Sequence, residues 1–443
     1  MKRLIFLWML LIGSLFFSAC EQVNPNFQEA ADRPEWIHRS VKKLTDVIVH
    51  DIFSPPVASR NYAYPMIAAY EVLRQGSPNY QSLAGQLNGL EVVPQPQADQ
   101  TYCYPLAAVH AFLTTARHFI FSEDKLMAFQ QEIATEFEAL KMPKAVYDRS
   151  IAYGEQMSQR IIDWSKTDLY AETRTYPRYS ISDEPARWAP TPPDYMDAIE
   201  PHWNKIRTMV LDSATQFVPE APTPFDMDKQ SQFYKELMEV YTAVKEADEE
   251  ELAIAQFWDC NPYVSHHKGH VMYATKKITP GGHWIGITQI ATRKNKANLM
   301  ETIEAYTLVA IALFDGFISC WDEKYRSNLI RPETVINQYL DEDWLPILQT
   351  PPFPEYTSGH SVISGASAVA LTHLFGDSFA FVDSTEVEYG LPPRSFTSFF
   401  DASDEAAISR LYGGIHYRPA IEYGVDQGRN VGKFIVGQLE LRQ

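Results

Sequence analysis

Three short segments in the last third of the chain share a composition suited to holding a small anion: cationic side chains, a hydroxyl, a glycine and two imidazoles. They are Lys324 with Arg331, then Ser358-Gly359-His360, then Arg410 with His416. Arginine binds two oxygens at once, lysine supplies a point charge, and glycine lets its amide approach closely. One histidine can attack or ligate the central atom while the other moves a proton. The segments therefore predict a pocket for a tetrahedral oxyanion such as phosphate or vanadate.

The order of these segments resembles that of one enzyme superfamily. Lys-x6-Arg-Pro, Ser-Gly-His and Ser-Arg-x5-His follow one another within about a hundred residues, which is similar to the motifs of the vanadium-dependent haloperoxidases and type 2 phosphatidic acid phosphatases. The resemblance implies an all-α fold of two packed helical bundles, with the anion site in the second bundle. Because trigonal-bipyramidal vanadate resembles the phosphoryl-transfer transition state, one pocket can serve either chemistry.

The resemblance also implies a role for each motif residue. His416 would be the axial group, which ligates vanadate or attacks phosphate, and His360 would be the acid–base residue beside the apical oxygen. Lys324 would stabilise the oxygen that becomes charged. The groups that hold the remaining oxygens would be Arg331, Arg410, Ser358 and the amide of Gly359.

Two aromatic residues favour the haloperoxidase branch. Trp321 and Phe353 resemble aromatic positions around the halide pocket of vanadium chloroperoxidases, although aromatic residues at such places also serve as core packing. An aromatic wall excludes water and strengthens hydrogen bonding to a bound peroxide. The preferred function is thus a vanadate-dependent haloperoxidase that uses hydrogen peroxide and a halide. A soluble acid phosphatase that cleaves a phosphoester with a histidine nucleophile is one alternative, and a non-catalytic oxyanion-binding envelope lipoprotein is another.

One position departs from the superfamily pattern. An aspartate commonly lies four residues after the last histidine and orients its imidazole, but here that position is Ala420. Glu422, a main-chain carbonyl or a carboxylate from elsewhere could substitute. The departure weakens the phosphatase alternative most and keeps the non-catalytic alternative open.

Overall charge separates this chain from nucleic-acid-binding proteins. Its 443 residues carry a formal net charge of −18, and no basic stripe interrupts the acidic composition. Nucleic acids and anionic membrane surfaces are therefore not expected partners. Against this acidic background, the cations of the three motifs indicate a local binding site rather than a solubilising surface.

The N-terminus has the pattern of an export signal. Residues 1–20 combine a short cationic start, an apolar run and Ser-Ala-Cys, which resembles a bacterial lipobox with Cys20 as the lipidated residue. Residues 21–33 would form a polar tether, and no later apolar stretch of membrane-spanning length is expected. We therefore expect a protein of the bacterial cell envelope, exported and tethered to a membrane through Cys20 alone.

The rest of the chain shows mostly helical spacing of its apolar residues. We expect an N-terminal helical region over residues 34–218 and a C-terminal helical domain over 225–443, separated by proline-rich connections. Helices are predicted at 36–49, 62–74, 105–121, 123–140, 144–164, 229–244, 249–258, 295–322, 360–374, 404–412 and 421–439.

Cysteine and histidine spacing gives little further evidence for metal binding. Cys103, Cys260 and Cys320 lack the spacing of a metal site and are expected to be buried, with one disulfide at most. Asp259 and the histidines of His266-His267-x-x-His270 have metal-like spacing, but nearby proline and glycine favour a loop at the pocket rim over a zinc site.

Overall fold

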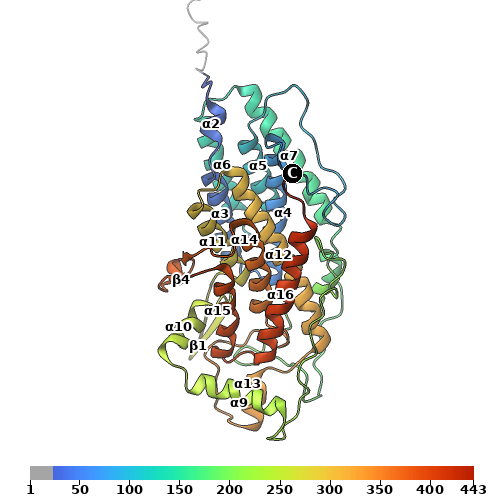
Figure 1. The fold of residues 1–443 in the computed structure, drawn as a ribbon, viewed down its shortest axis with the longest axis vertical. Coiled ribbons are helices and arrows are strands. Elements are labelled where there is room, and N and C mark those ends of the chain that lie inside the picture. The colour runs from blue at the N-terminus through green and yellow to red at the C-terminus, as the bar shows by residue number, and fades with distance from the viewer. Residues whose placement is uncertain (1–22) are drawn as a thin grey trace, which may run out of the picture.

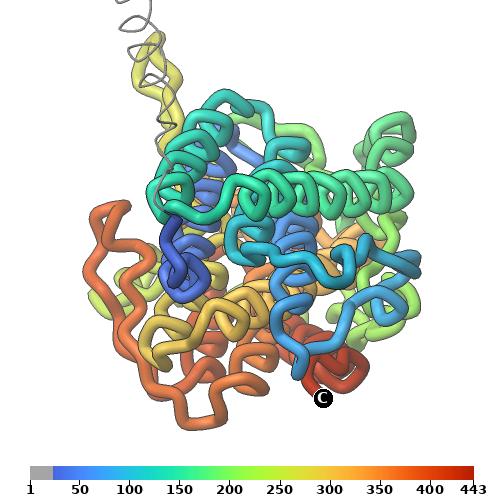
Figure 2. Tube along the Cα trace, turned by 90° about the horizontal axis from the view of Figure 1, so that it is seen from above, coloured from blue at the N-terminus to red at the C-terminus, as the bar shows by residue number. Residues whose placement is uncertain are grey.

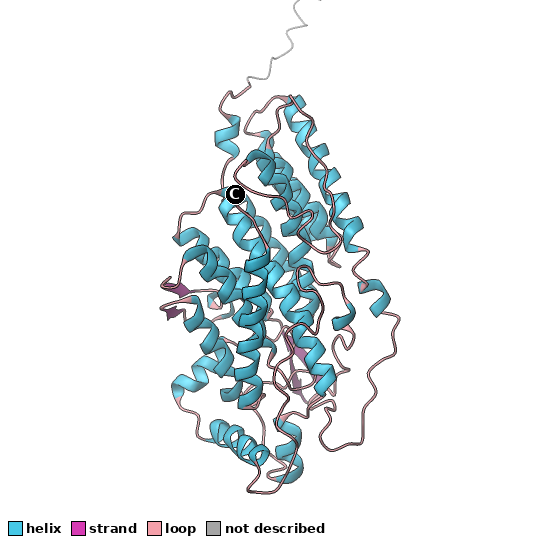
Figure 3. Cartoon of the chain, turned by 45° about the vertical axis from the view of Figure 1, so that its right-hand side comes forward, coloured by secondary structure: helices cyan, strands magenta, loops and turns pink. Residues whose placement is uncertain are grey.

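The structure is a computed structural model that describes residues 23–443, and most of these residues lie in helices (Figures 1 and 3). The longer helices are α3 (Glu35–Asp51), α4 (Pro55–Leu73), α5 (Tyr104–Arg117), α6 (Glu123–Glu138), α7 (Lys144–Ser165), α9 (Gln232–Lys245), α10 (Glu249–Phe257), α11 (Pro280–Lys294), α12 (Leu299–Ser327), α13 (Pro332–Tyr339), α14 (Gly359–Phe375), α15 (Phe399–Tyr412) and α16 (Arg418–Gln438). Strands are confined to two antiparallel hairpins in the described part of the chain, β1 (Val264–Lys268) with β2 (Val271–Thr275) and β3 (Phe381–Asp383) with β4 (Arg394–Phe396). The all-α expectation is confirmed.

Helix α12 passes through the middle of the molecule and packs against α4 and α14 (Figure 1). A capping box of Asn298 and Glu301 starts the helix, and Asn328 ends it in a left-handed conformation with φ of 50°. By length and composition α12 could cross a membrane, contrary to the expectation that no later stretch would, yet its most apolar window is completely buried inside the protein. That burial is the pattern of a core helix.

Helices α14 and α16 approach each other closely through glycines. A Cβ at Gly428 would lie 2.0 Å from the main-chain oxygen of Val362, so a side chain at this position cannot be accommodated without a shift. Gly424 and Gly432 on the same helix face also lie against α14. The close packing holds the N-terminal ends of both helices in one region, and these ends carry two of the predicted motifs.

One large hydrophobic core joins the two predicted regions. It includes residues of α3, α4, α5 and α7 together with residues of α11, α12, α14 and α16. Within the segment expected to be a tether, the short helix α2 (Phe27–Ala31) buries Phe27 and Ala31, so part of that segment packs on the body. The export signal and Cys20 lie outside the described residues.

The predicted helices match the observed ones to within a few residues in most cases. Helix α4 begins at Pro55, earlier than predicted, because prolines are favourable at the first helical positions. Helices α11 and α13 were not predicted. Cys103, Cys260 and Cys320 are buried and free, as thiols that pack in the interior would be.

The histidine-rich segment is a β-hairpin rather than an irregular loop. The hairpin β1–β2 projects from the body (Figure 2). His266 Nε2 lies 2.9 Å from Thr275 Oγ1, whereas His267 Nε2 lies 2.6 Å from Asp194 Oδ1. The two rings therefore have different partners in the structure.

Candidate oxyanion site

The ends of four helices bring the predicted motif residues together. Lys324 lies in the last turn of α12, and Arg331 is the N-cap of α13. Ser358 caps α14, where its Oγ accepts the Ser361 amide at 3.3 Å, so Gly359 and His360 form the first turn. The last two residues come from one connection: Arg410 lies in the last turn of α15, and His416 precedes α16.

These helix ends surround a cavity of about 280 Å³. Its walls include four motif residues and the two predicted aromatic residues: Gly359, His360, Arg410, His416, Trp321 and Phe353. Lys324, Arg331 and Ser358 are fully buried behind this wall. The rings of Trp321 and Phe353 pack with centroids 4.9 Å apart. The structure therefore places all seven motif residues at or directly behind one small cavity.

Hydrogen bonds fix the protonation state of the His416 ring. Nε2 lies 3.1 Å from Arg331 Nη1, which can only donate, so Nε2 must accept. Nδ1 therefore carries the proton and donates it to Glu355 Oε1 at 2.8 Å. Burial lowers the pKa of His416 well below its ordinary value, and Arg331 and Lys324 lower it further. The result is a neutral imidazole whose unprotonated Nε2 accepts from Arg331, so a ligand on Nε2 would replace that contact.

Glu355 supplies the carboxylate that Ala420 lacks. Its Oε1 accepts hydrogen bonds from His416 Nδ1 and from the Tyr417 amide at 2.9 Å. Glu422, a candidate for this role from sequence, instead lies at the surface, 3.7 Å from Arg418. Sequence reasoning missed Glu355, although a single acidic residue after Pro351-Pro-Phe-Pro is a signal that could have identified it.

Main-chain carbonyls hold the Lys324 ammonium. Nζ donates to the oxygens of Pro354 at 3.0 Å and Glu355 at 3.1 Å, and to that of Thr357. Burial lowers the pKa of Lys324 to about 7, and Glu355 opposes the shift. Phe353 covers the ammonium, with Nζ 5.0 Å from the ring centroid.

The two arginines are oriented by main-chain oxygens. Arg331 donates from Nε to Phe353 O at 3.0 Å and from Nη1 to Ile415 O at 2.8 Å. Arg410 donates from Nη2 to Trp258 O at 2.7 Å. Burial lowers the pKa of each guanidinium to about 10, so both remain charged at neutral pH. Each arginine is thus fixed in place while its charge is only partly compensated.

Several buried polar atoms at the cavity have no partner among the described residues. They include Arg331 Nη2, His360 Nε2 and Ser54 Oγ. Burial lowers the pKa of His360 well below its ordinary value, with Arg410 adding to the effect, so its ring is neutral. Unpaired buried polar groups are costly, and so is an excess of buried positive charge. An oxyanion would accept from Arg331 Nη2 and offset the positive charge, and a protonated oxygen of it could donate to His360 Nε2, so the residues fit vanadate or phosphate.

Comparison with known proteins identifies the family and the fold. Residues 304–441 match the protein family described as the VCPO second helical-bundle domain. The structure is similar to the crystal structure of a bacterial vanadium-dependent iodoperoxidase, with 53% sequence identity, a TM-score of 0.88, and coverage of 93% of this chain and 98% of that one. A comparison with curated proteins found no match.

More distant structures share the fold. A holo bacterial vanadium-dependent chloroperoxidase has a TM-score of 0.66 at 16% identity, covering 94% of this chain and 98% of that one. The apo form of a bacterial vanadium-dependent chloroperoxidase has a TM-score of 0.65 at 17% identity, covering 87% of this chain and 95% of that one. The superfamily inferred from three short motifs is confirmed, because a similar protein with more than half of its residues identical spans nearly the whole chain. The chain belongs to the vanadium-dependent haloperoxidases.

Proposed function

We propose that this enzyme binds vanadate at His416 and oxidises iodide with hydrogen peroxide. The observation that carries the proposal is the His416 ring, which lies between Glu355 and Arg331 and has an unprotonated Nε2 beside an aromatic-walled cavity. The choice of iodide rests on the similarity to an iodoperoxidase. The overall reaction consumes one hydrogen peroxide, one iodide and one proton, and yields hypoiodous acid and water.

The protein's own residues have separable tasks in this proposal. Bound vanadate would supply the Lewis acidity that activates hydrogen peroxide for oxygen transfer to iodide. His416 would hold the cofactor through Nε2, while Arg331 and Arg410 would bind its oxygens and balance its charge. Lys324 would stabilise the oxygen that is transferred through its positive charge, because its three N–H groups already donate to carbonyls. Ser358 and the Gly359 amide would donate to the remaining oxygens.

His360 is suited to moving the proton of hydrogen peroxide. Its ring is neutral because burial lowers its pKa, and its Nε2 has no partner among the described residues, so the ring can accept a proton at the cavity. The same proton can then be returned to the departing oxygen, which leaves as water. Trp321 and Phe353 would exclude bulk water from this exchange.

The size of the cavity favours small substrates. At about 280 Å³ it lies near the lower end of ligand pockets, which suits a halide and a peroxide better than a large organic phosphoester. Acid phosphatase activity is nevertheless the second candidate, because Glu355 restores the orienting carboxylate whose absence weakened it. The same contact removes the main ground for a non-catalytic protein.

A halide panel tests the proposal. Protein comprising residues 23–443 would be freed of vanadate and phosphate, and initial rates would be measured with hydrogen peroxide and iodide, bromide or chloride. We expect oxidation only after orthovanadate is added, with iodide the fastest. Phosphoester cleavage that vanadate inhibits, without oxidation of any halide, would favour the phosphatase; neither activity would favour the non-catalytic alternative.

We further propose that the chain is exported and anchored to a membrane of the cell envelope through a lipid on Cys20. The support is the sequence of residues 1–20, with its cationic start, apolar run and Ser-Ala-Cys ending. Metabolic labelling with a radioactive fatty acid in a bacterial host should label the full chain and leave a Cys20→Ala variant unlabelled. Equal labelling of both proteins would contradict the anchor.

A further inference from the structure

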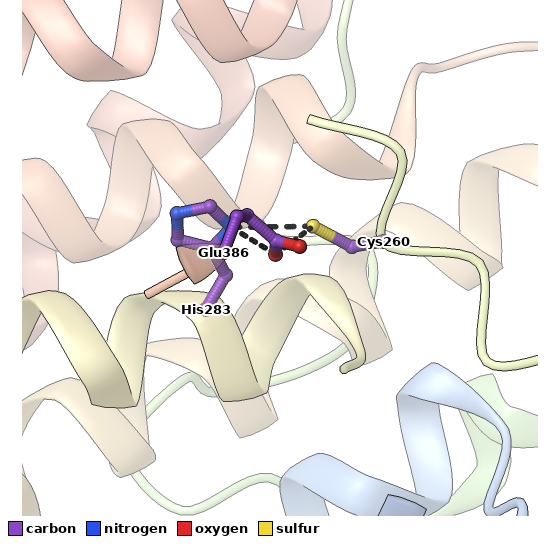
Figure 4. Close-up of side chains that lie close together, drawn as sticks. All are labelled: Cys260, His283 and Glu386. Carbon is purple, nitrogen blue, oxygen red and sulfur yellow. Dashed lines mark hydrogen bonds and ion pairs between the residues drawn. The ribbon is translucent and has the colours of Figure 1, made fainter. Parts of the chain in front are cut away.

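A second cluster of ligand-type side chains lies beside the oxyanion cavity. Cys260 follows α10, His283 lies in the first turn of α11, and Glu386 follows β3. The Cys260 thiol, the His283 ring and the Glu386 carboxylate converge in the protein interior (Figure 4). All three residues are at most 1% exposed, and Cys260 also lines the oxyanion cavity.

The spacing of the three ligand atoms matches that around a tetrahedral zinc ion. His283 Nδ1 lies 3.3 Å from Cys260 Sγ and 3.2 Å from Glu386 Oε1, and these two atoms are 4.0 Å apart. Zinc bonds of about 2.0–2.3 Å at tetrahedral angles place neighbouring ligand atoms about 3.3–3.6 Å apart. The triangle therefore has nearly the size of one face of a zinc tetrahedron, and its longest edge needs to close by only a few tenths of an ångström.

Asp383 orients the imidazole as a ligand. Its Oδ2 lies 2.7 Å from His283 Nε2, while its Oδ1 accepts both the amide and the hydroxyl of Thr385 at 2.9 and 2.7 Å. Thr385 Oγ1 also lies 2.7 Å from Nε2. With a metal ion bound, Asp383 would accept the Nε2 proton, and the Nδ1 lone pair would face Cys260 and Glu386. A carboxylate on the far nitrogen is the usual partner of a zinc-bound histidine. Trp258 stacks on the ring at 4.5 Å and fixes its plane.

A proton or a metal ion is required between His283 Nδ1 and Glu386 Oε1, which lie 3.2 Å apart. If the ring is neutral with its proton on Nε2, neither of these two atoms can donate; the other tautomer donates to Glu386 and leaves Nε2 to accept from Thr385 Oγ1 at 2.7 Å. Either a proton on Nδ1 or a metal ion removes this repulsion. The Cys260 thiol favours the metal ion over a proton on Nδ1. A thiolate, an imidazole and a carboxylate together form a characteristic zinc ligand set, whereas a carboxylate alone would satisfy an imidazolium.

We propose that Cys260, His283 and Glu386 bind a zinc ion, with Asp383 as the positioning residue for His283. Binding forms bonds from zinc to Sγ, Nδ1 and a carboxylate oxygen, and the thiol proton leaves to solvent. The ion would tie α11, the segment after α10 and the segment after β3 together. That connection reaches the oxyanion site, because the Trp258 ring stacks on His283 while its carbonyl accepts Arg410 Nη2.

Metal analysis of the whole described chain tests the proposal without reference to activity. Residues 23–443 would be purified, incubated with zinc sulfate, desalted and analysed by inductively coupled plasma mass spectrometry. We expect about one zinc per chain, retained by a Cys103→Ala variant and lost from Cys260→Ser. Cys103 is the matched control because it is also a buried free thiol, in a different part of the fold.

Cobalt substitution keeps the test decisive if the Cys260→Ser variant does not fold. Cobalt added to the unaltered protein should give the thiolate-to-cobalt charge-transfer absorption and the intense visible bands of a tetrahedral sulfur-containing site. Absence of both zinc and these bands would overturn the proposal and leave an imidazolium between two carboxylates. Zinc retained in full by a folded Cys260→Ser variant would equally overturn it.

Discussion

The role of Glu355 gives the sharpest prediction for the oxyanion site. Replacing Glu355 with glutamine keeps the shape of the side chain, and the amide oxygen can still accept from His416 Nδ1 and the Tyr417 amide. Only the negative charge is lost, and this charge is partial at neutral pH because burial raises the pKa of Glu355 to about 7. Charge-assisted hydrogen bonds are roughly twice as strong as neutral ones, so Nε2 of His416 becomes less basic and the ring less firmly held.

Whether Glu355→Gln raises or lowers the vanadate affinity depends on how the charge of Lys324 responds. Removing a carboxylate from a cationic pocket would by itself favour an anion, but Glu355 also raises the pKa of Lys324, which is only about 7. Without Glu355, Lys324 loses much of its own charge at neutral pH, so the pocket gains little net positive charge. The loss of His416 basicity then decides the outcome, and loss of such a supporting partner typically costs about 10–100-fold in affinity.

The expected result is therefore vanadate binding that is weaker by about 10–100-fold, or about 1.4–2.7 kcal/mol. Equilibrium dialysis at neutral pH, with vanadium determined in both compartments, measures it. Glu333→Gln is the control, because Glu333 is also a buried carboxylate near Arg331 but does not contact His416. Affinity unchanged or increased in Glu355→Gln, with normal folding, would refute the reasoning.

Two further predictions concern stability. Burial lowers the pKa of His38 to about 4, so the unfolded chain binds a proton below about pH 6.5 that the folded protein does not; the free energy of unfolding should fall by about 3 kcal/mol as the pH drops from 6.5 to 4. Denaturant titrations at several pH values should show a smaller change of the free energy of unfolding with pH in His38→Gln than in the unaltered chain. An equal change in the two proteins would contradict the lowered pKa of His38. Gly428→Ala should lower the free energy of unfolding by about 1–3 kcal/mol or more, because its Cβ would meet the Val362 carbonyl, whereas Gly437→Ala, with nothing within 4 Å, should be neutral or slightly stabilising. Equal denaturation midpoints for the two alanine variants would show that α14 and α16 can separate at low cost.

Local pattern was sufficient to predict most of the fold. Apolar periodicity identified the long helices because burial of one face recurs every three to four residues whatever the tertiary context. Helix α11 was missed because Gly281 and Gly282 lower helix propensity near its start, although Thr279 and Pro280 form a good N-terminal cap. Helix α13 has only eight residues, too few for a clear period.

Some residues of the site can be found from short sequence motifs, whereas others are brought together only by the fold. Lys324, Ser358 and Arg410 each lie in a short motif whose spacing carries the signal. Glu355 lies 61 residues from His416, so the local sequence can single out Glu355 as an unusual acidic residue but cannot show that it contacts His416. The Cys260–His283–Glu386 cluster likewise joins three separate segments and has no spacing that a sequence pattern could detect.

The central claim is that His416 holds the vanadate that makes this chain a haloperoxidase. The most direct test is the rate of iodide oxidation by hydrogen peroxide after loading with orthovanadate, compared between the unaltered chain, His416→Ala and His373→Ala. His373 is a control because it also lies on an α14 turn but at the opposite end of that helix from His360. We expect His416→Ala to lose vanadate-dependent oxidation and His373→Ala to retain it. A folded His416→Ala protein that oxidises iodide as fast as the unaltered chain, in a vanadate-dependent manner, would contradict it.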